Sequence, residues 1–257
     1  MIGARDTMFN TIGEMMLLLL EFFRTLPRAW RERQKVYEQL FEIGNASLLM
    51  ACILSVFIGG VIALQTGPVL VERGLASAIG GLVGLSMCKE LAPVMMSILI
   101  AGRVGSAMTA EIGSMRVYQE IDALRTMNIN PVQYLVMPRM IAISIALPTL
   151  VVFAVLVGWM GGALVSVYND SIAITFEAYF SNLSEMVGFE DVLNGLIKSF
   201  VFAVIIGLVS CQQGFETIGG PRGIGRSVTK SVVNSIVMIL ILDYFLTRLL
   251  LFMDSQP

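Results

Sequence analysis

The chain has 257 residues, of which 56% are hydrophobic and 14% are charged, and its formal net charge is −2. Soluble domains carry about 25% charged residues, so this composition excludes an ordinary soluble protein. The absence of histidine excludes histidine bases, histidine metal ligands and serine–histidine catalysis. The three cysteines stand far apart without a C-x-x-C pair, so neither a zinc site nor a disulfide framework is expected.

An amphipathic stretch occupies residues 8–41. Its apolar side chains recur at helical spacing, and a basic run follows them: Arg24, Arg28, Arg31, Arg33 and Lys35. This pattern is typical of a helix that lies on an anionic membrane surface, although a helix packed on the rest of the protein has a similar pattern. We therefore predict that residues 1–45 form an interfacial amphipathic helix and a basic linker.

Five apolar stretches follow, at approximately 46–71, 78–102, 133–165, 192–213 and 229–252. Each is long enough to cross about 30 Å of hydrocarbon at ~1.5 Å per residue. The predicted fold is therefore an all-α membrane protein with an N-terminal interfacial helix and five transmembrane helices. Residues 46–257 are expected to form one membrane domain.

The distribution of lysine and arginine predicts the orientation. Thirteen of these residues fall in the N-terminal segment and in the 103–139 and 214–230 connections. The 72–77 turn has only Arg73, and the 166–191 loop has none. Because basic residues favour the inner side of a membrane, the N-terminus is predicted to be cytoplasmic and the C-terminus periplasmic.

Small residues recur four positions apart in two places. This spacing lets helix backbones approach closely, in a bundle or in a dimer. The two sets are Gly102, Ser106 and Ala110, and Ala154, Gly158 and Gly162.

Five charged residues of the predicted spans lie between the midplane and the outer surface: Lys89, Glu90, Lys198, Asp243 and, near the outer end of the fifth span, Arg248. A charge there costs at least ~2.5 kcal/mol on insertion scales, so these side chains should pair or face water. Pro93 removes the helical hydrogen bond to the carbonyl of Lys89 and favours a kink. Two interpretations remain open, a polar cavity that opens outward and a buried ion pair that only holds helices together.

The 103–139 connection is predicted to contain a short amphipathic helix on the cytoplasmic side. Its apolar residues share one helical face, and Asn130-Pro131 ends the element. Glu120 and Asp122 would be repelled by anionic headgroups, so docking on a partner protein is the preferred interpretation. The apolar face consists of Val117, Ile121, Leu124 and Met127.

The segment GPRGIGRS at residues 220–227 nearly matches a phosphate-binding loop, with Arg226 in place of the lysine. That loop must follow a β-strand, whereas this segment follows an apolar span. No nucleotide site is therefore predicted in the chain, and the chain is not expected to be an enzyme. If transport requires ATP, another subunit must supply it.

Four segments together resemble the MlaE/YrbE permease family, and the similarity extends over nearly the whole chain after about residue 45. They are KELAPVMMSILIAGRVGSAMTAEIGSMRVYQEIDAL at 89–124, NPVQYLVMPRMIA at 130–142, LIKSFVFAVIIG at 196–207 and GPRGIGRSVTKSVVNSIVMILILDYFLT at 220–247. The first is similar to the family's signature block. Lys89 stands where some relatives have arginine, a change that keeps the charge.

The resemblance implies a permease subunit of an ABC-type system that moves phospholipids between the inner and outer membranes of bacteria. The chain would be a multi-pass protein of the inner membrane. Two permeases would form a homodimer core, with cytoplasmic ABC ATPase subunits that bind ATP and Mg. An MCE-domain hexamer would sit on the periplasmic side, and some systems add a STAS-domain protein. This chain would itself hold no cofactor and bind no nucleic acid.

The resemblance also implies two sites. A lipid pocket faces outward between the two permeases with Glu90 in its wall, and we assign to it Lys89, Leu91, Pro93, Lys198 and Asp243 as well. The coupling helix that docks in the ATPase corresponds to about Ser114–Met127. The residues expected to contact the ATPase are Glu111, Arg116, Val117, Glu120, Ile121, Asp122 and Leu124.

Two other functions are considered. A membrane scaffold would recruit partners through residues 114–127, but it would not need charges gathered at one depth. An ion-coupled secondary transporter would use Glu90 and Asp243, but such folds often contain inverted repeats, and none is recognised in this sequence. The sequence fixes neither the headgroup preference nor the direction of transport.

Overall fold

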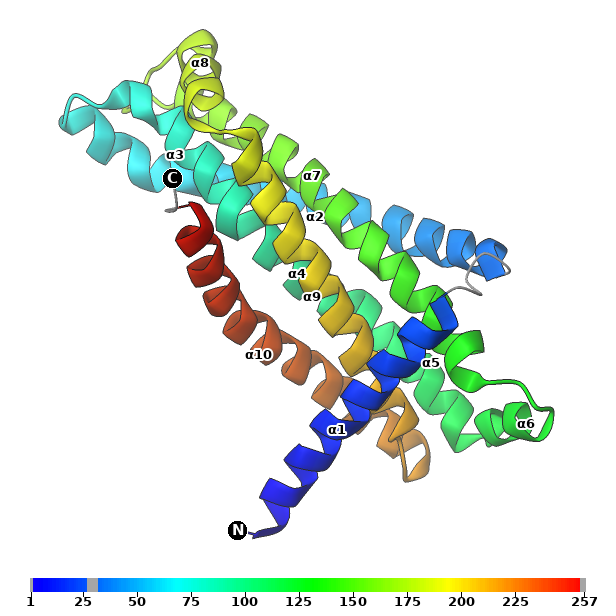
Figure 1. Ribbon diagram of the computed structural model, residues 1–257. Coiled ribbons are helices and arrows are strands. Elements are labelled where there is room, and N and C mark those ends of the chain that lie inside the picture. The colour runs from blue at the N-terminus through cyan, green and yellow to red at the C-terminus, as the bar shows by residue number, and fades with distance from the viewer. Residues whose placement is uncertain (1, 27–31, 255–257) are drawn as a thin grey trace. The chain divides into compact units, whose positions relative to one another are not determined.

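The computed structural model describes residues 2–26 and 32–254, with side chains placed for residues 13–26 and 32–253. This part of the chain is helical and contains no strand, which confirms the all-α prediction (Figure 1). The principal helices are α1 (Ile2–Thr25), α2 (Arg33–Glu72), α3 (Ile79–Ser86), α4 (Ala92–Ile100), α5 (Ser106–Val117), α6 (Glu120–Thr126), α7 (Met137–Tyr168), α8 (Phe176–Met186), α9 (Phe189–Phe215) and α10 (Gly220–Asp254).

Shorter helical turns connect some of these elements. Residues Ala76–Ala78 form the 3₁₀ turn η2. Three π turns interrupt longer helices: η3 (Met87–Leu91), η4 (Ala101–Gly105) and η5 (Val132–Val136). A π turn inserts one residue into a helix and often occurs at functional positions.

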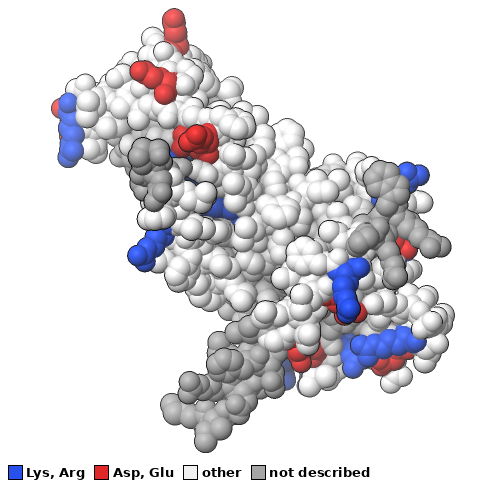
Figure 2. Space-filling view, in the orientation of Figure 1, with Lys and Arg blue, Asp and Glu red and all other residues white. Residues whose placement is uncertain are grey.

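Within the part of the chain that the structure describes, five helical stretches are long and apolar enough to cross a membrane, as predicted. They are Arg33–Glu72, Ala76–Val117, Val132–Tyr168, Phe189–Phe215 and Gly220–Met253. Each contains one predicted span and extends beyond it, because polar residues can continue a helix outside the hydrocarbon. White, uncharged residues form most of the visible surface (Figure 2).

The N-terminal region differs in detail from the single amphipathic stretch predicted at 8–41. Helix α1 ends at Thr25, and residues 33–45 already belong to α2, the first spanning helix. Glutamate, glutamine and lysine are good helix formers, so the polar segment continues the helix instead of linking it. The described residues do not include Arg28 and Arg31 of the predicted basic run. The side chain of Arg5 also lies outside the described part of the chain.

The chain forms two compact units, and five of the long helices contribute to both. The first unit consists of Met1–Ile43, Ile98–Ala146 and Phe202–Leu242. The second unit consists of Gly44–Ser97, Leu147–Val201 and Asp243–Pro257.

In the first unit, three helices meet around buried hydroxyl groups. Thr109 Oγ1 of α5 lies 3.1 Å from the carbonyl oxygen of Ser210 in α9 and 2.9 Å from Ser231 Oγ in α10. All three residues are fully buried. Hydrogen bonds of this kind hold helices together where apolar surroundings provide no water.

In the second unit, α2 and α7 are in backbone contact. A Cβ at Gly59 would overlap the carbonyl oxygen of Gly158, so only glycine fits there. One of the two small-residue sets therefore makes the close approach that its spacing predicts. In the first unit, Gly102 of the other set has no atom within 4 Å of a Cβ position.

Helix α8 lies in the loop 166–191, where no helix was predicted. Thr175 caps its first turn, since Thr175 Oγ1 accepts a hydrogen bond of 3.2 Å from the N–H of Ala178. Tyr179 and Leu183 form its buried face, and acidic side chains gather around α8 (Figure 2). The sequence pattern was too short to separate this helix from a loop.

Candidate functional site

Four of the five charged residues predicted in the outer half of the spans come together in the second unit around Lys198; Arg248 is exposed. Only 3% of the Lys198 side chain is exposed, and its Nζ lies 2.9 Å from Glu90 Oε1 and 3.1 Å from Asp243 Oδ1. Nζ also donates to the carbonyl oxygen of Lys89 at 3.0 Å and to Thr247 Oγ1 at 2.7 Å. An ammonium has three protons, so these contacts satisfy it fully in a buried place.

Lys89 has a different partner from its neighbour Glu90. Lys89 Nζ lies 2.8 Å from Asp191 Oδ1, and the Asp191 side chain is 15% exposed. The Lys89 ammonium and the Lys89 carbonyl therefore serve two different contacts, the first with Asp191 and the second with Lys198. We call Lys89, Glu90, Asp191, Lys198 and Asp243 the Lys198 cluster.

Backbone irregularity at η3 makes the contact with Lys89 possible. Pro93 has no N–H and cannot donate the α-helical hydrogen bond to the carbonyl of Lys89. The helix widens into η3 immediately before this proline, with Ala92 N–H bonded to Met87 O five residues back. The sequence predicts this irregularity. In the structure, Lys198 Nζ donates a hydrogen bond to the Lys89 carbonyl, which lacks the donor that Pro93 cannot provide.

Close packing brings α9 to this irregular turn. A Cβ at Gly195 would overlap the carbonyl oxygen of Cys88 in η3. The missing side chain therefore allows α9 to lie against η3, which places Lys198, three residues further on, beside the Lys89 carbonyl.

Thr247 and Asp191 belong to this site but were not predicted. Thr247 Oγ1 donates to Glu90 Oε1 at 3.1 Å while it accepts from Lys198. Its signal in the sequence is the spacing from Asp243, because residues four apart share a helical face. Asp191 was assigned to a loop, whereas it lies in the first turn of α9.

A pocket of about 280 Å³ opens beside the cluster. Its charged and polar lining is Ser86, Lys89, Glu90, Asn194, Lys198 and Thr247, and its apolar lining is Leu85, Leu250 and Leu251. Asp243 is not part of the lining, although it contacts Lys198, which is. Leu91 and Pro93, which were predicted to belong to a pocket, are also absent from the lining. A polar cluster beside leucine walls is suited to a molecule with a polar end and an apolar tail.

The second predicted site, around residues 114–127, lies in the first unit. The structure divides this segment between the end of α5 and the helix α6, so it is not one continuous helix. The division falls at Gln119, whose φ of 62° lies in the left-handed region that ends a helix. No glycine or proline marks this turn, and the apolar spacing continues across it.

Ion pairs stabilise this turn. Arg116 Nη1 lies 3.0 Å from Asp122 Oδ1, so the last turn of α5 is tied to the first turn of α6. Arg139 Nη2 lies 2.7 Å from Glu111 Oε2 and connects α5 to α7. Of the residues expected to contact a partner, Glu111, Glu120 and Asp122 are exposed, Arg116, Val117 and Leu124 are half-buried, and Ile121 is fully buried.

Apolar side chains are exposed at both ends of α6. Tyr118 is 66% exposed and Met127 is 61% exposed. The sequence pattern predicts Met127 on one apolar face with Ile121, but Ile121 is buried in the core and Met127, just after the end of α6, is exposed. Exposed apolar residues beside charged ones are typical of a protein docking surface.

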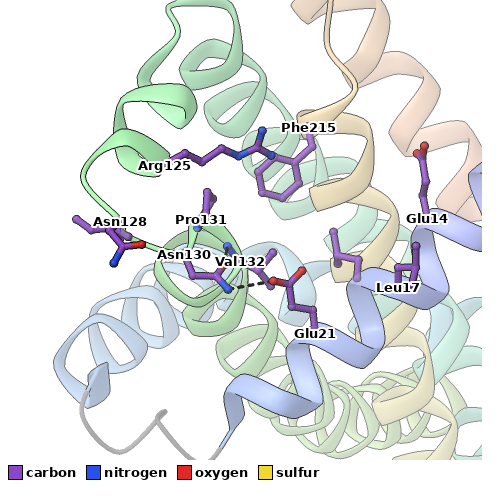
Figure 3. Close-up of a pocket in the computed structure, with 11 residues that line it drawn as sticks. Glu14, Leu17, Glu21, Arg125, Asn128, Asn130, Pro131, Val132 and Phe215 are labelled. Carbon is purple, nitrogen blue, oxygen red and sulfur yellow. Dashed lines mark hydrogen bonds between the residues drawn. The ribbon is translucent and has the colours of Figure 1, made fainter.

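A larger pocket of about 540 Å³ lies between α1 and the segment that follows α6 (Figure 3). Asn130 Nδ2 donates to Glu21 Oε1 at 3.0 Å, which ties α1 to this segment. Arg125 of α6 and Phe215 of α9 also line it, with Glu14 and Leu17 of α1 (Figure 3). This pocket was not predicted, because its walls come from distant parts of the chain.

Two carboxyl groups interact near the end of α9. Burial is the main cause that raises the pKa of Glu216. The hydrogen bond with Glu14 and the negative charge of Glu14 raise this pKa further, whereas the positive charge of Lys230 lowers it. Gln212 and Gln213 donate to the Glu216 carboxyl at 3.1 and 3.3 Å. The contact between α1 and this end of α9 therefore favours a protonated carboxyl.

Comparison with protein families gives a match to the family described as Permease MlaE over residues 36–249. The matched range includes the Lys198 cluster and residues 114–127, which we call the α5–α6 turn.

Individual relatives are similar over most of their length. A protein named "Probable ABC transporter permease protein" from Rickettsia felis is 37% identical over 96% of this chain and 95% of its own length. A protein with the same description from Synechocystis is 39% identical over 96% of this chain and 95% of its own. The protein named "TRIGALACTOSYLDIACYLGLYCEROL 1, chloroplastic" from Arabidopsis thaliana is 39% identical over 85% of this chain and 61% of its own.

Proposed function

Because the chain belongs to the MlaE permease family, as its resemblance predicted, we propose that it moves phospholipid between the inner and outer membranes of a bacterium as the membrane subunit of an ATP-driven transporter. The chain is a multi-pass membrane protein and a permease subunit of the ABC transporter family, which is a transport component and not an enzyme. An ABC transporter permease works with an ATPase partner.

The Lys198 cluster beside its pocket is the observation that carries the lipid assignment. Charges inside a membrane span are costly and are retained where they serve a pathway or a ligand. Leu85, Leu250 and Leu251 provide an apolar wall for an acyl chain, while Glu90 and Lys89 provide polar contacts for a headgroup. The name of the Arabidopsis relative includes that of a galactosylated diacylglycerol, a lipid that shares its diacylglycerol part with phospholipids.

Two copies of the chain form the transporter core in this proposal. The pocket opens toward the outer side between the two copies. Glu90 and Lys89 contact the headgroup, while Lys198, which also pairs with Asp243, holds Glu90 in place through an ion pair. Leu91 and Pro93 contribute through the shape of η3 and not through direct contact. An MCE-domain hexamer receives or delivers lipid on the periplasmic side, and a STAS-domain protein is an optional further subunit.

Orientation and the role of α1 belong to the same proposal. The N-terminus lies in the cytoplasm and α1 lies in the interface of the inner membrane. Apolar side chains of α1 are exposed, and they give it a surface for lipid contact: Met16 at 61%, Leu17 at 66%, Leu20 at 60% and Phe23 at 56%.

The α5–α6 turn docks on the cytoplasmic ATPase, which binds the ATP and Mg. Closure of the ATPase moves this turn and changes the opening of the lipid pocket. Nucleotide shifts the equilibrium between two permease states only if ATP favours one of them, so the coupling must differ between the states.

Replacement of Glu90 by alanine tests the lipid assignment. Lys198 keeps Asp243 as a partner, so the protein should remain folded and assembled, while lipid transport between reconstituted membranes should fall severalfold. The matched control is Glu185→Ala, which removes an exposed carboxylate of α8. Normal transport by the Glu90 variant would exclude this residue from the mechanism, and an intact complex that carries no lipid would favour the scaffold.

Replacement of Met127 by aspartate tests the docking surface. Because Met127 is 61% exposed, its loss should not disturb the fold, whereas the half-buried Leu124 is less suited to the test. The variant should lose most of the ATPase during co-purification but remain in the membrane. The control is Met186→Asp on α8, where the parent side chain is 43% exposed. Full retention of the ATPase by Met127→Asp would contradict the coupling assignment.

A further inference from the structure

The Lys198 cluster contains more negative than positive groups. Glu90, Asp191 and Asp243 contribute three carboxylates, while Lys89 and Lys198 contribute two ammonium groups. When all five are ionised, the cluster has an excess of one negative charge inside the membrane-spanning part of the chain. A charge in such a place requires a partner or water.

The neighbouring cation on α10 does not remove this excess. Arg248 follows Thr247 by one position and therefore projects about 100° away around the helix. Arg248 is exposed and does not line the pocket.

Of the three carboxylates, Glu90 is the most accessible and the one that lines the pocket. Glu90 has 40% of its side chain exposed, against 21% for Asp243 and 15% for Asp191. The Lys198 side chain is 3% exposed, whereas the Lys89 side chain is 37% exposed, so Glu90 and Lys89 are the most accessible charged groups of the lining. The Lys89 ammonium is already held by Asp191 at 2.8 Å.

We propose that this pocket selects lipids whose headgroup ends in a primary ammonium, such as phosphatidylethanolamine, over lipids with an anionic headgroup, such as phosphatidylglycerol. The inference rests on the lipid transport proposed above. A primary ammonium supplies the missing positive charge and donates charge-assisted hydrogen bonds to the Glu90 carboxylate. An anionic headgroup adds negative charge to a place that already has an excess.

The remaining polar lining suits the phosphate of such a lipid. Lys89 and Asn194 both line the pocket and both carry N–H donors that a phosphate oxygen accepts. A zwitterionic headgroup therefore finds acceptors at Glu90 and donors at Lys89 and Asn194, while the leucine wall holds its acyl chain.

A quaternary ammonium provides an internal test of the contact. Phosphatidylcholine carries the same charge as phosphatidylethanolamine but has no N–H to donate. Its retention should therefore lie between those of phosphatidylethanolamine and phosphatidylglycerol. The competing way to remove the excess charge is a proton held between Glu90 and Asp243, which also interact with each other. A proton there predicts no headgroup preference.

The experiment uses the intact transporter complex, purified with its co-expressed partners and placed in nanodiscs with equal amounts of phosphatidylethanolamine and phosphatidylglycerol. Lipid that stays with the complex after detergent exchange is measured by mass spectrometry. A partly exposed ion pair should give a retained ratio about fivefold in favour of the ethanolamine lipid. Free ethanolamine added to a parallel sample should leave the retained lipid unchanged.

Three variants give the direction of the effect. Glu90→Gln removes the excess charge without changing the side-chain size, so the retained ratio should fall to that of the bilayer. Lys89→Gln increases the excess and should raise the ratio above that of the unaltered complex. Glu185→Gln removes a carboxylate from the exposed face of α8 and should leave the ratio unchanged.

The possible failures are distinguishable. Lipid retained at the bilayer ratio by the unaltered complex would overturn the headgroup inference but leave the transport proposal standing. An intact complex that retains no lipid would overturn both. Displacement of the lipid by free ethanolamine would show a site for soluble amines and would also overturn the inference.

Discussion

The Lys198 cluster of the second unit and the α5–α6 turn of the first unit use ion pairs for different purposes. Lys198 is 3% exposed and is surrounded by four acceptor groups. At the turn, the Arg116 and Asp122 side chains are 36% and 53% exposed. Water screens the exposed pair of Arg116 and Asp122, whereas water cannot replace the partners of the buried Lys198. The same kind of contact is therefore essential in one place and minor in the other.

Removal of the cation should give the largest difference in stability between the two sites. Lys198→Met leaves Glu90 and Asp243 without their ammonium, and loss of one partner of a buried pair costs about 3–5 kcal/mol. Arg116→Met is the matched change at the turn, where an exposed pair contributes ~0.2–1 kcal/mol. Free energies of unfolding in mixed micelles measure both. Equal losses for the two variants would refute the distinction between the sites.

Glycine substitutions extend the comparison to the backbone. Gly195→Ala places a Cβ against the Cys88 carbonyl, so it should push α9 away from η3 and cost about 1–3 kcal/mol. In the first unit, Gly102→Ala meets no atom within 4 Å, and alanine favours a helix, so this change should stabilise by up to ~1 kcal/mol. Thermal unfolding midpoints would then shift in opposite directions. A shift in the same direction for both would contradict the packing described at Gly195.

The smallest expected effect concerns Glu216 in the first unit, where two carboxyls interact and Lys230 only partly opposes the resulting pKa shift. The pKa of Glu216 is raised above its ordinary value of 4.5, so the folded state binds its proton more tightly than the unfolded chain does. This contribution to stability is complete below pH 4.5 and is lost as the pH rises through the raised pKa.

Glu216→Gln should remove this pH dependence. The variant should gain stability relative to the unaltered protein as the pH rises from 4.5 toward neutral, by a small amount because Glu216 is exposed on one side. Unfolding midpoints measured across this pH range test the prediction, with Glu185→Gln as the control. A constant difference between variant and parent would contradict the shift.

The parts of the fold that hydropathy governs were predictable. The five spans and the gathering of Lys89, Glu90, Lys198 and Asp243 follow from the cost of placing polar groups in hydrocarbon. These constraints act on each residue separately, so they are readable without knowledge of the tertiary structure.

The remaining features depend on contacts between distant residues. Nothing in the sequence near Gln119 marks a left-handed residue, because the turn is stabilised by the pairing of Arg116 with Asp122. Thr247 is a small polar residue on an apolar helix, and only its contacts with Glu90 and Lys198 give it a role. The partner of Lys89 could not be chosen either, since Asp191 was one of several acidic residues in its loop.

The carbonyl of Lys89 has a consequence for sequence variation at this position. A main-chain oxygen cannot be deleted by a point mutation, so every residue at position 89 retains this acceptor for Lys198 as long as η3 and Pro93 persist. The side chain at position 89 is thereby released from the task of anchoring Lys198. Substitutions there remove the partner of Asp191 but none of the contacts of Lys198, which makes position 89 a suitable place to begin changing the selectivity of the pocket.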